Sequence, residues 1–198
     1  MKHYLMRHPA VAATGLCIGQ TDIPLSEEGR ASLNDLIQVV RATSPDLIIS
    51  SDLRRCRDLA EAAGFQLGCP VRLDARWREI DFGIWENRSW DEIRRADEAG
   101  VERWSLDFRH ESSPGGESFQ DLLKRVAAAV EDLPRDRTAM VITHAGCLRA
   151  LACFLKIISP ERMFDWEVPY GALFALDLDG WPEQLVVRAT KKQPAFAC

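Results

Sequence analysis

An Arg-His pair and a second histidine each stand at the end of a short apolar run. Arg7-His8 follows residues 3–6, and His144 follows residues 139–143 (AMVIT). A neutral imidazole can attack phosphorus, whereas a guanidinium binds phosphate oxygens through parallel N–H donors and stays charged at any working pH. These residue types therefore indicate chemistry on a phosphoryl group.

Arg55 is expected in the first turn of a helix that follows the apolar run 47–49. This position beside a strand end would bring a second guanidinium close to His8. Nearby arginines disfavour protonation of an imidazole through like-charge repulsion. His8, beside two arginines, is then a candidate nucleophile near neutral pH. Direct attack would give a phosphohistidine that water resolves in a second step.

The leaving alkoxide needs a proton, and Glu79 in segment 78–83 (REIDFG) is the candidate donor. A bound phosphate dianion favours protonation of a neighbouring carboxylate, so Glu79 could act as acid and then as base. Asp81 and Glu86 lie close by, and a solvated loop residue is the alternative interpretation of Glu79.

The elements that must position these residues alternate between strands and helices. Strands are predicted at 3–6, 47–49, 71–73, 139–143, 173–178 and 185–187, and helices at 26–40, 53–59, 118–133 and 146–155. Ser50, Ser51 and Asp52 offer N-cap residues for the second helix, and Ser118 offers one for the third. The alternation predicts a three-layer α/β/α sandwich with a mostly parallel central sheet, in which the last strands could form an antiparallel edge. Such a sheet would gather the candidate residues at the carboxyl ends of its strands.

We expect one domain over residues 1–198 with a small inserted cap at about 77–117. That cap segment is rich in tryptophan: Trp77, Trp85, Trp90 and Trp104. Tryptophans are more often core than ligand platform. If Trp85 or Trp104 lined a pocket, a flat aromatic substrate would be favoured.

Five segments, in order, resemble signature segments of the histidine phosphatase (phosphoglycerate mutase-like) superfamily. They are 5–8 (LMRH), 50–55 (SSDLRR), 78–86 (REIDFGIWE), 114–118 (PGGES) and 141–146 (VITHAG). The likeness spans residues 3 to about 155. Within the superfamily, segment 15–25 (GLCIGQTDIPL) is most similar to the α-ribazole phosphatase branch, whose members remove a phosphate from a nucleotide-like intermediate of cobalamin synthesis.

The resemblance implies that His8 is the nucleophile, that Glu79 is the acid, and that Arg7, Arg55 and His144 bind the phosphoryl group. Arg55 is preferred to its neighbour Arg54 because the family spacing is Ser, any, Leu, any, Arg.

The resemblance also places Gln20, Thr21 and Ala145 at the substrate. Pro9 and Ala145 depart from the family pattern, which has glycine at both positions. Proline has no amide hydrogen to give to a phosphate, so the following loop must accommodate it.

The expected activity is metal-independent hydrolysis of a phosphomonoester, with α-ribazole 5′-phosphate as the candidate substrate and with no metal site and no cofactor. One alternative is a phosphosugar mutase, which returns the phosphoryl group to its intermediate. Another is a phosphate-binding module without turnover, which the Pro9 and Ala145 departures motivate. A metal-dependent hydrolase comes last, because no HExxH or spaced Cys/His cluster is present.

Composition and net charge limit the classes of molecule that the protein is expected to bind. Hydrophobic residues make up 46% and charged residues 28%, and 25 Lys and Arg against 30 Asp and Glu give a net charge of −5. This balance disfavours nucleic acid but allows a small phosphorylated metabolite. Neither a signal-peptide hydrophobic region nor a membrane-spanning stretch is evident, and six cysteines without a secretory signal favour reduced thiols, so we expect a cytoplasmic protein.

Overall fold

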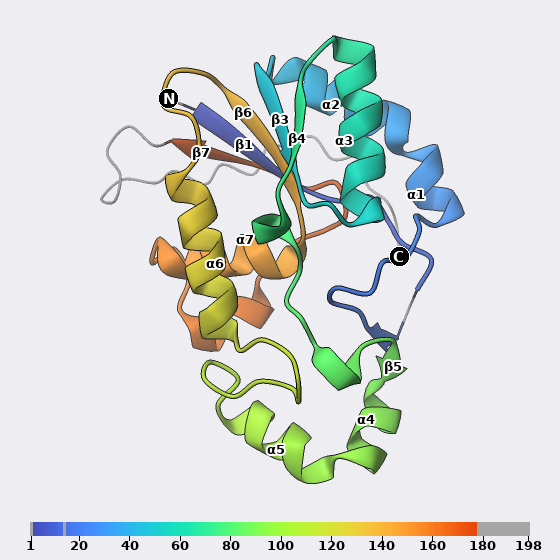
Figure 1. Ribbon diagram of the computed structural model, residues 1–198, viewed down its shortest axis with the longest axis vertical. Helices are drawn as coiled ribbons and strands as arrows, with labels where there is room; N and C mark the ends of the chain where they lie inside the picture. Colours follow the sequence, from blue (N-terminus) through green and yellow to red (C-terminus); the bar gives the residue numbers. More distant parts are fainter. Residues whose placement is uncertain (1, 14, 178–198) are drawn as a thin grey trace.

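A five-stranded sheet in the order β4-β3-β6-β1-β7 forms the centre of the computed structural model, which describes residues 2–13 and 15–177 (Figure 1). β4, β3, β6 and β1 run parallel, and β7 pairs antiparallel with β1. The strands are β1 (Lys2–Arg7), β3 (Leu47–Ser50), β4 (Val71–Leu73), β6 (Ala139–Thr143) and β7 (Leu173–Asp177). The mostly parallel sheet and its antiparallel edge are confirmed, while the strand predicted at 185–187 lies outside the described residues.

Helices cover both faces of this sheet, which confirms the three-layer α/β/α sandwich (Figure 1). One layer contains α6 (Phe119–Glu131) and α7 (Ala145–Phe154), and the other contains α2 (Leu33–Ala42) and α3 (Arg54–Leu67). Successive strand side chains point to opposite layers, so Leu5 and Val141 pack in the core with α6 and α7. Their neighbours Met6 and Ile142 pack in the core with α2 and α3. Burial on both faces explains why these strands are continuous apolar runs.

The helix starts follow local capping chemistry in most places. Ser118 is the N-cap of α6 and forms a capping box with Asp121, as its sequence position predicts. The predicted helix 26–40 is instead two helices, α1 (Glu27–Ala31) and α2, which meet at Ser32.

The expected caps of α3 are wrong. Leu53 occupies the N-cap position and makes no side-chain capping bond. Ser51 instead lies with its Oγ 2.9 Å from His144 Nε2, and Asp52 pairs with Arg78. Ser51 Oγ also accepts from the Leu53 amide at 3.4 Å, but neither Ser51 nor Asp52 is the N-cap of α3, and both side chains make long-range contacts near the strand ends.

The chain between β4 and α6 extends away from the sheet (Figure 1). Its elements are η1 (Ala75–Trp77), η2 (Gly83–Trp85), β5 (Arg88–Ser89), α4 (Trp90–Ala96) and α5 (Glu98–Leu106). β5 pairs with the short strand β2 (Leu16–Cys17). Trp85 is fully buried in a small core with Cys17, Ile93 and Val101, and Trp104 packs at its edge. Trp85 is therefore a core residue and does not line an open pocket.

The last described helical element is η3 (Pro160–Asp165), which follows α7 and precedes β7. Among the helices of residues 2–13 and 15–177, none has the length and apolar character needed to cross a bilayer.

Candidate active site

The two histidines follow neighbouring parallel strands at matched positions. Arg7, the last residue of β1, is in register with Thr143, the last residue of β6. The His8 amide donates to the Thr143 carbonyl at 2.9 Å, and the His8 and His144 ring centroids lie 5.1 Å apart. The sheet register thus brings both imidazoles to one edge, on the same side of the molecule.

His8 is buried, and a backbone carbonyl fixes its tautomer. Its Nδ1 lies 2.7 Å from the Pro9 carbonyl oxygen, which can only accept a hydrogen bond. In the neutral ring Nδ1 therefore carries the proton and Nε2 carries the lone pair. Burial, followed by the charges of Arg55 and Arg7, holds the pKa of His8 well below its usual range. The carbonyl of Pro9 is the group that orients His8, and this contact needs no amide hydrogen at position 9.

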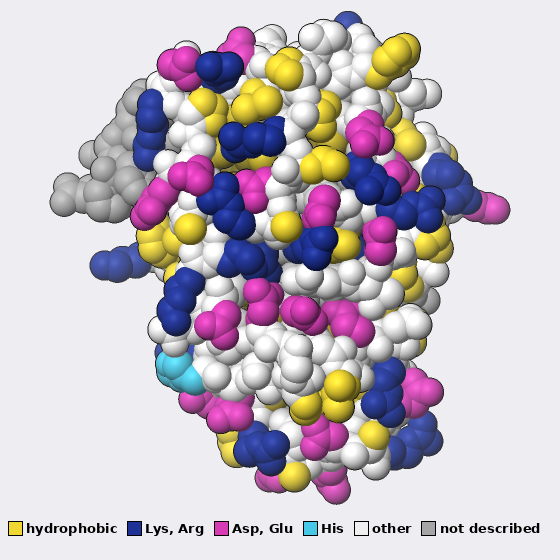
Figure 2. Space-filling view, in the orientation of Figure 1, with side chains coloured by type: hydrophobic (Ala, Val, Ile, Leu, Met, Phe, Trp, Pro, Cys, Tyr) yellow, Lys and Arg dark blue, Asp and Glu magenta, His cyan; other side chains and the backbone are white. Residues whose placement is uncertain are grey.

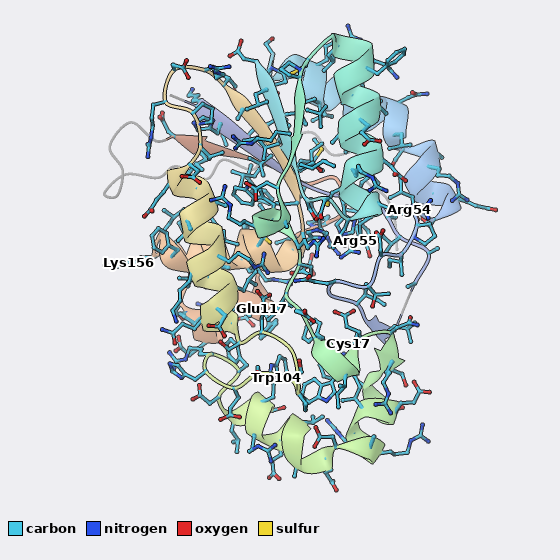
Figure 3. The ribbon with its side chains drawn as sticks, viewed as in Figure 1. Cys17, Arg54, Arg55, Trp104, Glu117 and Lys156 are labelled. Atoms are coloured by element: carbon cyan, nitrogen blue, oxygen red, sulfur yellow. The ribbon has the colours of Figure 1, made fainter. Side chains whose placement is uncertain are left out.

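Arg55 is almost completely buried beside the histidines. Its Nη1 donates to the Thr21 carbonyl at 2.9 Å, its Nη2 donates to the Gly19 carbonyl, and its Nε donates to His144 Nδ1 at 3.2 Å. Each Nη retains one further N–H for a ligand. Arg54 is exposed and lies on the outer side of α3, whereas Arg55 lies below the strand ends (Figure 3). The helix register separates the two arginines as the spacing rule expects.

His144 is fully buried at the N-cap position of α7. Burial and then the charge of Arg55 hold its pKa well below the usual histidine range. Because Nδ1 accepts from Arg55, the neutral ring has its proton on Nε2, which faces Ser51 Oγ at 2.9 Å. Both ring nitrogens thus have protein partners. His144 orients Arg55 here, and a direct bond to a phosphoryl oxygen would replace one of these contacts.

Arg7 is held by the segment that precedes β7. Its Nη1 donates to the Val168 carbonyl at 2.5 Å, and its guanidinium lies 3.9 Å from the centroid of the Tyr170 ring. The Arg7 amide donates to Ala172, and the Gly171 amide donates back to the Arg7 carbonyl. The Nε atom of Arg7 is buried and has no hydrogen-bond partner among residues 2–13 and 15–177. This orphaned donor fits an anionic ligand.

Glu79 reaches the same edge from the loop after η1. Its Oε2 accepts from the Gly146 amide and its Oε1 accepts from the Ile80 amide, both at 3.0 Å. A Cβ at Gly146 would lie 1.9 Å from Glu79 Oε1, so a side chain there would displace the carboxylate. The charge of Glu79 interacts electrostatically with the guanidinium of Arg7. The carboxylate therefore lies at the start of α7, close to the arginine and histidine cluster.

Gln20, Thr21 and Ala145 lie beside this cluster, and the side chains of Gln20 and Thr21 have protein partners. The side chain of Gln20 bridges the Glu79 carbonyl and Arg78 Nη1, each at 3.3 Å. The hydroxyl of Thr21 donates to Glu86. Ala145 is buried as the first residue of α7. In this arrangement Gln20 and Thr21 support the loop beside the site.

Arg125 is a supporting residue that the sequence interpretation missed. It donates to the carbonyls of Arg76 (2.9 Å), Arg78 (2.8 Å) and Glu79 (3.2 Å), and it pairs with Glu117 at 2.6 Å. A charged residue three positions after Leu122, on the apolar face of α6, is the signal that could have revealed it.

Tyr170 was also missed. Its ring lies 5.5 Å from the ring of His8 and covers Arg7, and 42% of the residue is exposed. The surrounding Pro169-Tyr170-Gly171 has the sequence of a turn before a strand, so no local signal marks it as a site residue.

The residues described by the structure contain no group of three or more His, Cys, Asp and Glu side chains that could hold a metal ion. Positive charge at this edge comes from Arg7 and Arg55, and the candidate nucleophile is the Nε2 of His8.

Known proteins resemble this chain in sequence and in fold. The adenosylcobalamin/alpha-ribazole phosphatase of Escherichia coli (strain K12) is 27% identical over 184 residues, which are 90% of this chain and 91% of that protein. A probable phosphoglycerate mutase of Salmonella choleraesuis (strain SC-B67) is 33% identical over 168 residues, 81% of this chain and 78% of that protein. The crystal structure of the alpha-ribazole phosphatase from Shigella flexneri superposes with a TM-score of 0.85 at 26% identity, covering 96% of this chain and 95% of that one.

The family comparison covers nearly the whole chain. The sequence model of the histidine phosphatase superfamily (branch 1) matches residues 3–190. This range includes the strand ends that carry Arg7-His8 and His144, the helix start that carries Arg55, and the loop that carries Glu79. The chain therefore belongs to the histidine phosphatase superfamily, branch 1.

Proposed function

We propose that this protein hydrolyses phosphomonoesters through a phosphohistidine at His8. The observation that carries the proposal is the state of this imidazole: its Nδ1 is held by the Pro9 carbonyl, and its pKa is depressed by burial and by two arginines. The Nε2 lone pair attacks phosphorus, a P–N bond forms, and the bond from phosphorus to the leaving oxygen breaks. Water then attacks the same phosphorus, the P–N bond breaks, and inorganic phosphate leaves.

Arg7 and Arg55 stabilise the charge on the transferring phosphoryl oxygens. Within residues 2–13 and 15–177, the buried Nε of Arg7 has no hydrogen-bond partner, and each Nη of Arg55 has one N–H left for a ligand. Charged donors that are fixed before the reaction stabilise developing negative charge without reorganising. His144 contributes by fixing the Nε of Arg55.

Glu79 donates a proton to the leaving oxygen in the first step and takes a proton from the attacking water in the second. This role is supported by the position of the Glu79 carboxylate, which accepts from the Gly146 amide at the start of α7 and interacts with the charge of Arg7. Proton transfer by a positioned carboxyl group returns Glu79 to its starting state after each turnover.

No metal ion enters this scheme, because the arginines supply the positive charge that a metal would otherwise provide. Hydrolysis should therefore continue in EDTA. We also propose that residues 77–117 act as a cap over the strand ends, since Glu79 and Glu86 both reach the site from this segment.

The proposed substrate is a small phosphorylated metabolite, and α-ribazole 5′-phosphate is the first candidate. The similarity to the E. coli and S. flexneri phosphatases, which covers 90% and 96% of this chain, supports it. A phosphosugar mutase is the second candidate, favoured by the 33% identity to the Salmonella protein.

Nucleic acid is not a proposed partner. The face in Figure 2 carries Lys and Arg interspersed with Asp and Glu rather than a continuous basic surface, and the net charge is −5. We place the protein in the cytoplasm, where the free thiols of Cys17, Cys56, Cys69, Cys147 and Cys153 would persist.

A panel of phosphomonoesters with and without EDTA tests the proposal. α-Ribazole 5′-phosphate, an aryl phosphate and phosphoglycerates would be compared, and both free phosphate and transferred phosphate would be measured. Release of phosphate in EDTA supports hydrolysis, whereas transfer to a second hydroxyl supports the mutase. Phosphate binding without either reaction would instead support a non-catalytic binding module.

A further inference from the structure

Glu86 has an unusual number of hydrogen-bond donors on one carboxylate. It accepts from the amides of Gly19 (3.0 Å), Gln20 (2.6 Å) and Thr21 (3.1 Å), from the Thr21 hydroxyl (2.5 Å) and from the Phe82 amide (3.2 Å). Three successive backbone N–H groups that converge in this way form a nest for an anion. In this protein the anion is a side chain from the 77–117 segment.

The same loop holds Arg55 from its opposite side. The carbonyls of Gly19 and Thr21 accept from the two Nη atoms of Arg55, while the amides of these residues donate to Glu86. The loop is therefore fixed between a carboxylate and a guanidinium. Together with His144 at Nε, these contacts determine where the remaining N–H donors of Arg55 point.

Position 19 has no room for a side chain beside Glu86. A Cβ on Gly19 would lie 1.9 Å from the Ile80 carbonyl oxygen and 2.5 Å from Glu86 Oε1. Burial alone would raise the pKa of Glu86, but the bonds from Thr21 and the loop amides outweigh it and lower the pKa. The carboxylate is thus charged at neutral pH, when it attracts all five donors.

We propose that Glu86 is a positioning residue for phosphate binding, which acts by holding the Gly19–Thr21 loop so that its carbonyls fix the guanidinium of Arg55. Glu86 reaches Arg55 through the loop and is not itself a catalytic residue. The inference rests on the proposed function in one respect, namely that Arg55 binds the phosphoryl group. Loss of the Glu86 carboxylate should therefore weaken phosphate binding only as long as Arg55 is present.

A double-mutant cycle tests this coupling. The dissociation constant of inorganic phosphate would be measured by calorimetry for the wild type, Glu86→Gln, Arg55→Ala and the double variant. Glu86→Gln should weaken phosphate binding about tenfold in the wild-type background and less than about twofold in the Arg55→Ala background. Equal factors in the two backgrounds would overturn the proposal, because they would show that Glu86 acts independently of Arg55.

Glu92→Gln is the matched control. Glu92 lies in the same segment and caps α4 by accepting from Ser89, but it does not contact the loop or Arg55. It should leave phosphate affinity unchanged, and equal weakening by Glu92→Gln and Glu86→Gln would contradict a specific role for Glu86. If Glu86→Gln fails to fold, Glu86→Asp enters the same cycle, and its shorter carboxylate should again weaken binding only when Arg55 is present.

Phosphate binding does not depend on turnover, so the two proposals fail separately. A wild type that binds phosphate with a coupled cycle but hydrolyses nothing would refute the proposed hydrolysis and retain the role of Glu86. A wild type that hydrolyses phosphomonoesters but shows no coupling between Glu86 and Arg55 would refute the role of Glu86 and retain the proposed hydrolysis.

Discussion

The two sides of the candidate site are held by different kinds of contact. On the sheet side, backbone hydrogen bonds place Arg7 and His8: the Arg7 amide donates to Ala172 and the His8 amide donates to Thr143. On the other side, Glu79 and the Gly19–Thr21 loop are placed by side-chain and helix-terminal contacts. Sheet positions are fixed by many cooperative bonds, whereas each loop position depends on one or two side chains. On the sheet side, we therefore expect a single substitution to change the chemistry and leave the neighbouring backbone in place. On the loop side, substitution of a distant supporting residue should also displace a site residue.

The largest expected effect is on the sheet side, at the nucleophile. His8→Asn removes Nε2, and its amide nitrogen can still donate to the Pro9 carbonyl, so the fold should be retained. We expect kcat for an aryl phosphate to fall by roughly 10⁵–10⁶-fold. A variant that kept more than a tenth of wild-type turnover in a steady-state assay would exclude His8 as the nucleophile.

On the loop side, Glu79→Gln should be the next most damaging change. It retains the shape of the side chain but cannot transfer a proton, which should lower kcat by about 10²–10⁴-fold. The loss should shrink for a substrate such as p-nitrophenyl phosphate, whose leaving group needs no proton. An equal loss for alkyl and nitrophenyl esters would show that Glu79 supports the structure rather than the proton transfer.

Arg7→Met tests the electrostatics of the sheet side and should lower kcat/KM by about 10²–10³-fold. The charge of Arg7 helps to depress the pKa of His8, so its removal should raise that pKa. A histidine with a depressed pKa stays neutral until the pH falls well below 6.5. The wild-type kcat/KM should therefore stay constant down to such a pH and fall below it. In Arg7→Met the acid limb should move to higher pH.

Arg7→Lys keeps the charge and is the control for this shift. Its acid limb should stay near the wild-type position even if the rate falls through lost bidentate contacts. Identical acid limbs for the wild type, Arg7→Lys and Arg7→Met would show that Arg7 does not govern the protonation of His8.

The smallest effect is expected for Arg125→Met, which acts on the loop side at a distance. Loss of the three carbonyl contacts should loosen the loop of Glu79 and lower kcat by about tenfold, with a modest loss of thermal stability. Lys124→Met, at the exposed neighbouring position, is the control and should match the wild type. If both variants behaved alike, Arg125 would have no special role in holding Glu79.

The same comparison explains how much could be predicted from the sequence. The strand ends were predictable because apolar runs mark buried parallel strands, and the register then brings His8 and His144 together. The contact of Ser51 with His144, the pairing of Arg125 with Glu117, and the stacking of Tyr170 on Arg7 were not predicted. Ser51 and Tyr170 meet partners more than ninety residues away, so local spacing carries no trace of those contacts.

The loop contacts illustrate the limit in another way. Glu86 lies within a recognisable motif, yet the motif does not indicate that the carboxylate binds the amides of residues 19–21. Likewise, Ser51 and Asp52 have the residue types of helix caps, but tertiary contacts with His144 and Arg78 take precedence over capping. Residue type predicts the kinds of bond that a side chain can form, and only the fold determines its partner.

The most direct test of phosphoryl transfer through His8 is detection of the phosphoenzyme. Wild-type protein would be mixed with substrate, quenched in alkali, in which a phosphohistidine survives, and digested for mass spectrometry. We predict a phosphoryl group on His8 that is lost in acid and absent from His8→Asn. Release of phosphate with no phosphorylated His8 at any time in the turnover, or with the phosphoryl group on another residue, would contradict it.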